Sequence, residues 1–126
     1  MQFVSYKWLG MPRLGVLRDG LVYPLNVCGF DGHLLDLIDA GPHTLDAVKR
    51  TLELLTTDQS VGPLSNLTLH AVIPRPRRTI FCAGKTYRDH AIEYSKSGYD
   101  KTDAQEVPDK PVAFFKLAEC VVSSGD

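Results

Sequence analysis

Residues 14–25 read LGVLRDGLVYPL, two short apolar runs joined by Asp19-Gly20. A two-residue turn of type I′ needs positive φ at both central positions, and Asp-Gly is one of the pairs that tolerate it. The stretch therefore predicts a β-hairpin. The second strand should end at Pro24 or lie at a sheet edge, since proline cannot donate a backbone hydrogen bond. Residues 3–6 predict a further short strand before the hairpin.

A helical pattern follows the hairpin. Leu34, Leu35, Leu37 and Ile38 predict a short apolar helical turn that ends near Gly41, and Pro42 suits the first turn of a new helix. Four apolar residues then recur at helical spacing: Leu45, Val48, Leu52 and Leu55. We expect this second helix to run roughly to Leu55, with its apolar stripe packed in the core.

The middle of the chain predicts a loop, a strand and a linker. Residues 56–65 are polar and contain glycine and proline, which indicates a loop. Residues 67–73 alternate as a half-buried strand does, with His70 on the solvated face. Residues 74–78, PRPRR, favour an extended connection, and we place a domain boundary there.

Beyond the linker, residues 79–83 predict a buried strand. A helical segment should begin near Thr86 or Tyr87. Residues 95–110 are polar and charged, as in a long loop, and residues 111–116 predict another strand.

Composition places the chain among soluble globular proteins. Of its 126 residues, 44% are hydrophobic and 23% charged, with a formal net charge of -1. That charge gives no broad attraction to nucleic acid or anionic membranes. The first residues lack the pattern of a signal peptide, so we expect a cytoplasmic protein. Three distant cysteines, Cys28, Cys82 and Cys120, predict small buried side chains rather than disulfides or a zinc site.

The segment at residues 84–93, GKTYRDHAIE, is the most informative one for chemistry. It follows a strand and opens a helix, on which His90 and Glu93 would be neighbours. A glutamate beside an imidazole can fix its tautomer, so that the histidine takes a proton as a general base. Tyr87, one turn earlier, could aim a hydroxyl at a substrate. On spacing alone, a surface pair worth about 0.2–0.5 kcal/mol is the better interpretation.

Lys116 is a second candidate, at the end of the predicted strand and on the same face as Val112 and Phe114. A lysine there could stabilise an enolate or bind a substrate carboxylate. Without further information, a strand-end lysine that extends into water is the better interpretation.

In their order, these motifs resemble a known family. The strand with Gly84-x-x-Tyr87-x-x-His90-x-x-Glu93, the polar loop, and residues 110–116, KPVAFFK, resemble the start of the fumarylacetoacetate hydrolase (FAH) family's catalytic domain. The first roughly 70 residues resemble the small N-terminal domain of bacterial members. The resemblance therefore covers the whole chain and is more specific than any single motif.

The resemblance implies an α+β fold with two domains. Residues 1–73 would form a small N-terminal β-hairpin/helix domain, and residues 79–126 the truncated start of an FAH-type mixed β-roll. Family members are usually homodimers that hold Mg2+ (or Mn2+ or Ca2+) with three carboxylates. They act on dicarbonyl or keto-enol acids, often in aromatic catabolism. Their reactions include hydrolysis of acylpyruvates or fumarylpyruvate, and isomerisation or decarboxylation of hydroxymuconate-type acids.

The resemblance also implies roles for single residues. His90 would be the general base and Glu93 its orienting partner, while Tyr87 and Lys116 would bind substrate. The loop at residues 95–110 would be a lid that excludes water.

The chain departs from the family pattern in places. Thr86 stands where the family usually has asparagine, and Leu117 where it has proline. The family's metal ligands lie beyond the equivalent of Asp126, so we assign no metal ligand and expect Mg2+ only in a full-length parent. The chain is expected to be a fragment, inactive alone, with unpaired strand edges and exposed apolar faces. The alternative is a truncated, catalytically inactive binding or structural module.

Overall fold

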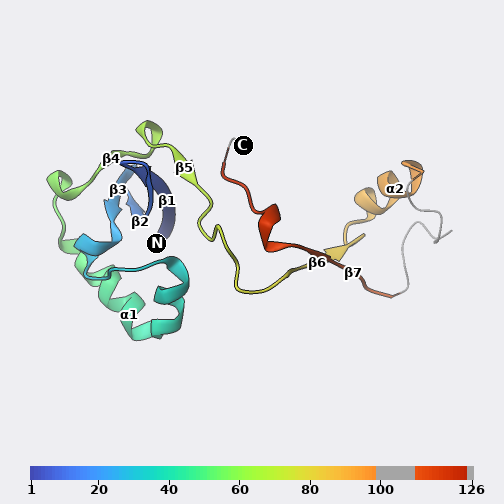
Figure 1. The fold of residues 1–126 in the computed structure, drawn as a ribbon, viewed down its shortest axis with the longest axis horizontal. Helices are drawn as coiled ribbons and strands as arrows, with labels where there is room; N and C mark the ends of the chain where they lie inside the picture. Colours follow the sequence, from blue (N-terminus) through green and yellow to red (C-terminus); the bar gives the residue numbers. More distant parts are fainter. Residues whose placement is uncertain (99–109, 125–126) are drawn as a thin grey trace. The chain divides into compact units, whose positions relative to one another are not determined.

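The computed structural model describes residues 1–98 and 110–124 of the chain (Figure 1). The chain divides into two compact units. Unit 1 comprises Met1–Arg75 and the residues from Val121 onward, and unit 2 comprises Pro76–Cys120. The limits proposed above for independently folding domains, residues 1–73 and 79–126, stay predictions.

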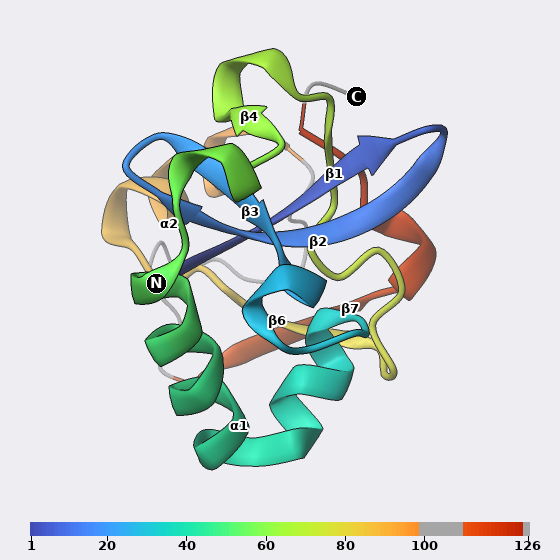
Figure 2. The same ribbon diagram turned by 90° about the vertical axis from the view of Figure 1, so that its left-hand side faces the viewer.

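Unit 1 is built on a five-stranded antiparallel sheet with the order β4-β3-β2-β1-β5. The sheet curls into a half-barrel, which Figure 2 shows with the long helix α1 beside it. Its strands are β1 (Gln2–Trp8), β2 (Met11–Arg18), β3 (Leu21–Pro24), β4 (Gly62–Pro63) and β5 (Leu69–His70).

The predicted hairpin is confirmed. Asp19 and Gly20 both have positive φ, 51° and 78°, as a type I′ turn requires, and they join β2 to β3. The second strand ends at Pro24, as predicted. A second tight turn joins β1 to β2 at Leu9 (φ 50°) and Gly10, where no residue pattern had predicted one.

The helical prediction is also confirmed. Helix α1 (Leu34–Leu54) is two helices that meet at Gly41, where φ is 81° and ψ is -177°, so Pro42 opens the second one. Val48 and Leu52 are buried, while Leu45 is 38% exposed. The helix and the sheet share one core, made of Leu14, Val16, Tyr23, Leu25, Cys28, Leu37, Val48 and Leu52.

Arg18 ties the hairpin to the end of α1. Its guanidinium donates hydrogen bonds to the carbonyl oxygen of Leu52, to that of Leu55 at 2.8 Å, and to the Tyr23 hydroxyl at 2.7 Å. The guanidinium carbon also lies 4.4 Å from the centroid of the Tyr23 ring. The last carbonyl groups of a helix have no partner within it, so a cation here stabilises the helix end.

Two predictions for the middle of the chain need correction. The expected loop at residues 56–65 contains a short strand, β4, which pairs with β3. The expected strand at residues 67–73 is only β5, two residues long. The prediction that His70 lies on a solvated face is wrong as well. Its side chain is half-buried, and its Nδ1 lies 2.7 Å from the Ser123 Oγ.

Unit 2 contains β6 (Ile80–Gly84), α2 (Arg88–Lys96) and β7 (Val112–Lys116), with β6 and β7 antiparallel. Both predicted strands and the helix are confirmed, although the helix begins at Arg88. The prediction of a buried β6 is wrong, since Phe81 is 67% exposed. Its ring meets that of Phe115 edge-on at a centroid distance of 5.3 Å.

The predicted α+β class is therefore confirmed. Within the described residues unit 2 holds a two-stranded ribbon, one α-helix and a 3-10 turn at Ala118–Cys120, and the mixed β-roll stays a prediction. Of the cysteines, Cys28 is buried as predicted, Cys82 is half-buried and Cys120 is exposed. No helix in the described part of the chain is long and apolar enough to cross a membrane.

Candidate functional site

The segment from Gly84 to Glu93 forms a strand–turn–helix unit. Strand β6 ends at Gly84, and Lys85 takes a positive φ of 52°, which turns the chain out of the strand. The first helical hydrogen bond runs from the Ala91 N–H to the Tyr87 carbonyl oxygen at 2.9 Å. Tyr87 therefore lies at the entrance to α2, immediately before its first residue.

Of the four predicted site residues, three lie on this segment. His90 and Glu93 are both in α2, three residues apart, so they occupy neighbouring positions along the helix. Glu93 is exposed, and the Tyr87 side chain is 78% exposed. The His90 side chain lies outside what the structure describes, and so does most of the predicted lid, residues 99–109.

The ribbon does not bring Lys116 to the start of α2. Lys116 pairs with Ile80 at one end of the ribbon, whereas Val112 pairs with Gly84 at the other. At about 3.3 Å per residue, the two ends are about 13 Å apart. The strand register does confirm that Lys116 shares a face with Val112 and Phe114.

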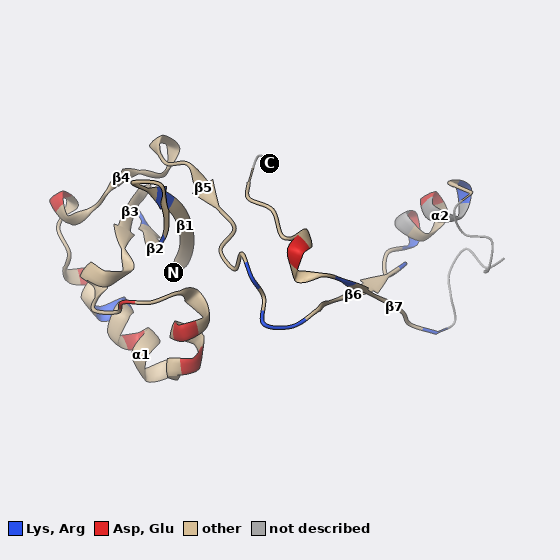
Figure 3. Cartoon of the chain, viewed as in Figure 1, with Lys and Arg blue, Asp and Glu red and all other residues tan. Residues whose placement is uncertain are grey.

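The charged residues at the two ends of α2 are placed to stabilise the helix. Asp89 in the first turn and Lys96 in the last turn both complement the helix dipole. Figure 3 shows basic residues along the connection before β6 and at both ends of α2. Among the described residues, no three His, Cys, Asp or Glu side chains are grouped to hold a metal ion. These residues therefore do not fit the three-carboxylate site that the resemblance implies.

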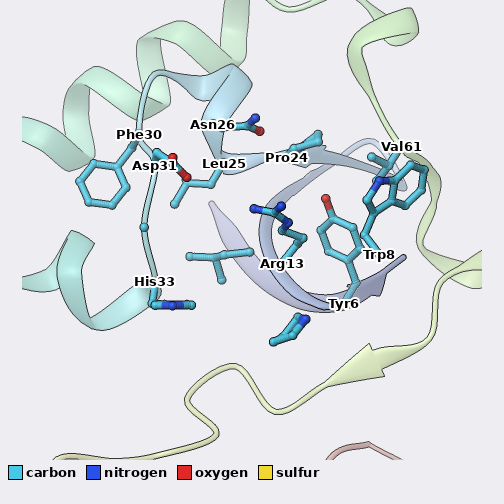
Figure 4. Close-up of a pocket in the computed structure, with 13 residues that line it drawn as sticks. Tyr6, Trp8, Arg13, Pro24, Leu25, Asn26, Phe30, Asp31, His33 and Val61 are labelled. Carbon is cyan, nitrogen blue, oxygen red and sulfur yellow. The ribbon is translucent and has the colours of Figure 1, made fainter. Parts of the chain in front are cut away.

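Unit 1 contains a cavity of about 360 Å³ that the sequence analysis did not predict (Figure 4). Its walls come from β1, β2, the end of β3, the 3-10 turn Leu25–Cys28 and the loop that leads into α1. The polar side chains at the cavity are those of Tyr6, Arg13, Asn26, Asp31 and His33. They are spread over 28 positions of sequence, and the strand register pairs only Tyr6 with Arg13, so the tertiary structure was needed to reveal them together.

Comparison with known proteins gives one informative match. No family model matches the chain. Oxaloacetate tautomerase YisK of Bacillus subtilis (strain 168) is 41% identical to it over 63 residues, which is 50% of this chain and 19% of that protein. The chain thus matches only about a fifth of that relative's length. That enzyme is a member of the FAH family, and the match supports a relationship between this chain and the fumarylacetoacetate hydrolase family.

Proposed function

We propose that this chain is the N-terminal part of an FAH-family enzyme that acts on keto or keto-enol acids. The observation that carries the proposal is the 41% identity over 63 residues to an oxaloacetate tautomerase. The strand–turn–helix unit at Gly84–Glu93, which presents the family-like motif, supports it. Keto–enol isomerisation is the first reaction to test because it is the activity in that relative's name. Hydrolysis or decarboxylation of related acids in aromatic catabolism is the next.

The proposed step is a proton transfer. In a keto–enol isomerisation, a base removes a proton from the carbon beside the ketone, and a proton is delivered to the ketone oxygen. The C=O π bond is replaced by the C=C π bond of the enol, and no other bond changes. We assign the base to His90 and its orientation to Glu93, since the two positions are one helical turn apart. Tyr87 would donate a hydrogen bond to the substrate, because its exposed ring lies at the entrance to the same helix.

The roles of Lys116 and of a metal ion have less support in this proposal than the roles of His90 and Glu93. Lys116 would bind a substrate carboxylate from the other end of the ribbon, with no direct contact to the start of α2. Mg2+ and a homodimer belong to the proposal only for a longer protein. The described acidic residues do not form a metal site, and no step here depends on one.

The test uses the longest open reading frame that contains these 126 residues. The protein would be assayed for oxaloacetate tautomerisation, and then with acylpyruvates and fumarylpyruvate. A general base contributes about 10²- to 10⁴-fold, so His90→Ala should lower turnover by at least about 100-fold. Glu93→Gln should lower it less, and with a shifted pH profile.

His43→Ala is the matched control, since His43 is an exposed histidine on α1 in unit 1. It should leave turnover unchanged. Full activity in His90→Ala would show that His90 is not the base. Absence of turnover with every keto acid would contradict the proposed function.

The alternative is an inactive binding or structural module. Thr86 in place of the usual asparagine, and the lack of an acidic cluster among the described residues, favour it. Calorimetric titration of the 126-residue chain with Mg2+ and oxalate separates the cases. Tight binding by this chain alone would contradict the interpretation as a catalytic fragment.

A further inference from the structure

The unit 1 cavity contains a buried hydroxyl without a hydrogen-bond partner. Tyr6 is 1% exposed and lines the cavity. No side chain or backbone group in the described part of the chain makes a hydrogen bond to its hydroxyl. Buried polar groups in folded proteins nearly always have such a partner, from the protein, from water or from a ligand. The Tyr6 hydroxyl is therefore available to a molecule in the cavity.

A cation comes from the neighbouring strand on the same face of the sheet as this hydroxyl. Arg13 is opposite Tyr6 in the register of β1 and β2, so the two side chains leave the same face of the sheet. Burial raises the pKa of Tyr6, and the smaller effect of the Arg13 charge lowers it, which agrees with a guanidinium nearby. Arg13 is exposed and forms no salt bridge or side-chain hydrogen bond within the described residues. A guanidinium in this position can bind a carboxylate in a bidentate manner.

The rest of the cavity suits an aromatic body. Trp8, next to Tyr6 on the same face of β1, is 45% exposed and offers an indole surface. Phe30, Pro12, Pro24 and Leu25 supply further apolar wall. The volume, about 360 Å³, is within the range of small-molecule sites, which pair apolar walls with a few polar groups.

Asp31 limits the charge of the ligand. Its carboxylate also lines the cavity, and Figure 4 draws it across Arg13 from Tyr6 and Trp8. A second carboxylate on the ligand would be repelled there, while a single carboxylate at Arg13 would not need to approach it. We therefore expect the site to bind dicarboxylates such as oxaloacetate less well than monocarboxylates.

We propose that this cavity binds a small aromatic monocarboxylate. The carboxylate would pair with the Arg13 guanidinium and accept a hydrogen bond from the Tyr6 hydroxyl, and the ring would pack against Trp8. All its lining residues belong to unit 1 and none is in the Gly84–Glu93 segment, so the proposal stands whether or not the proposed enzymatic function is correct.

Trp8 makes the test direct, because it is the single tryptophan of the chain. The 126-residue protein would be titrated with phenylacetate while Trp8 fluorescence is recorded, and heats would be measured in parallel. We expect a saturable change. Arg13→Gln should weaken binding at least about tenfold, the size expected for losing a charged hydrogen-bond partner. Tyr6→Phe should weaken it a few-fold. Asp31→Asn should strengthen the binding of succinate, a dicarboxylate, more than that of phenylacetate.

Two sets of controls distinguish binding at this site from non-specific binding to the protein surface. Lys7 lies between Tyr6 and Trp8 in sequence, but its side chain is on the other face of β1. Lys7→Gln therefore removes a positive charge away from the cavity, and this variant should bind phenylacetate as well as the unmodified chain does. Phenethyl alcohol keeps the ring without the charge, and succinate keeps carboxylates without the ring. Both should bind at least about tenfold more weakly than phenylacetate.

Several outcomes would overturn the proposal. These are no saturable response to phenylacetate, an Arg13→Gln variant that binds as well as the unmodified chain, or equal affinity for phenethyl alcohol. Circular dichroism of each variant establishes that it is folded. Arg13 and Asp31 are exposed, so their replacement should not disturb the core.

Discussion

Unit 1 and unit 2 use similar apolar side chains in opposite ways. In unit 1, Val16, Tyr23 and Leu37 are each at most 2% exposed, since the curled sheet and α1 cover one another. In unit 2, Phe81 and Phe115 are each 67% exposed, and every residue of β7 is exposed. An alternating apolar strand becomes a core only where a second layer covers it, and a two-stranded ribbon has no such layer.

The largest expected effect is a difference in local stability between the two units. Amide hydrogen exchange should show opening free energies in β1 and β2 near the global value, on the order of 5 kcal/mol or more. In β6 and β7 we expect about 2 kcal/mol or less, because few buried contacts hold the ribbon. Equal, strong protection of both units from hydrogen exchange would contradict this comparison, because it would mean that a further layer packs against β6 and β7.

The next effect is a matched pair of truncations. Leu37→Ala should destabilise unit 1 by about 2–5 kcal/mol in urea unfolding, because it opens a cavity in a packed core. Phe81→Ala should cost less than about 1 kcal/mol, since most of that ring already contacts water. The comparison would be contradicted if Phe81→Ala proved as costly as Leu37→Ala. Ile38→Ala, a neighbour of Leu37 with 59% exposure, is the control for loss of helix-surface area.

A smaller effect tests how the hairpin is joined to α1. Arg18→Met keeps an apolar stem but removes the hydrogen bonds to Leu52, Leu55 and Tyr23. We expect a loss of about 1.5–3 kcal/mol, the range for hydrogen bonds to a charged group. Arg50→Met, on an exposed position of the same helix, should change stability by less than about 0.5 kcal/mol. Equal effects of both variants on the urea midpoint would show that Arg18 does not fasten the helix end.

The sequence predicted those features that depend on a few adjacent residues. Asp19-Gly20 fixes a hairpin turn, because both residues accept positive φ. Gly41-Pro42 separates two helices, because glycine accepts φ 81° and proline starts a helix well. The strand–turn–helix unit that carries His90 and Glu93 was also predictable from local pattern.

Other features were not predictable because they depend on distant segments. The alternation at residues 67–73 predicted a full strand with a solvated His70, but only two residues pair with β1, and the His70 ring meets Ser123. The apolar composition of β6 predicted burial, but no layer covers it in the described structure. Local pattern sets the conformation a segment prefers and leaves open which surface, if any, lies against it.

The sequence by itself therefore determined the Asp19-Gly20 turn, the helix break and the family-like motif, since these follow from backbone freedom and side-chain spacing. The tertiary structure alone decided which apolar residues form a core and which stay exposed. It also decided that Tyr6, Trp8 and Arg13 meet at one cavity, because the register of β1 against β2 sets Arg13 opposite Tyr6. Register results from the sum of many cross-strand contacts and turn geometries, which no short stretch of sequence contains.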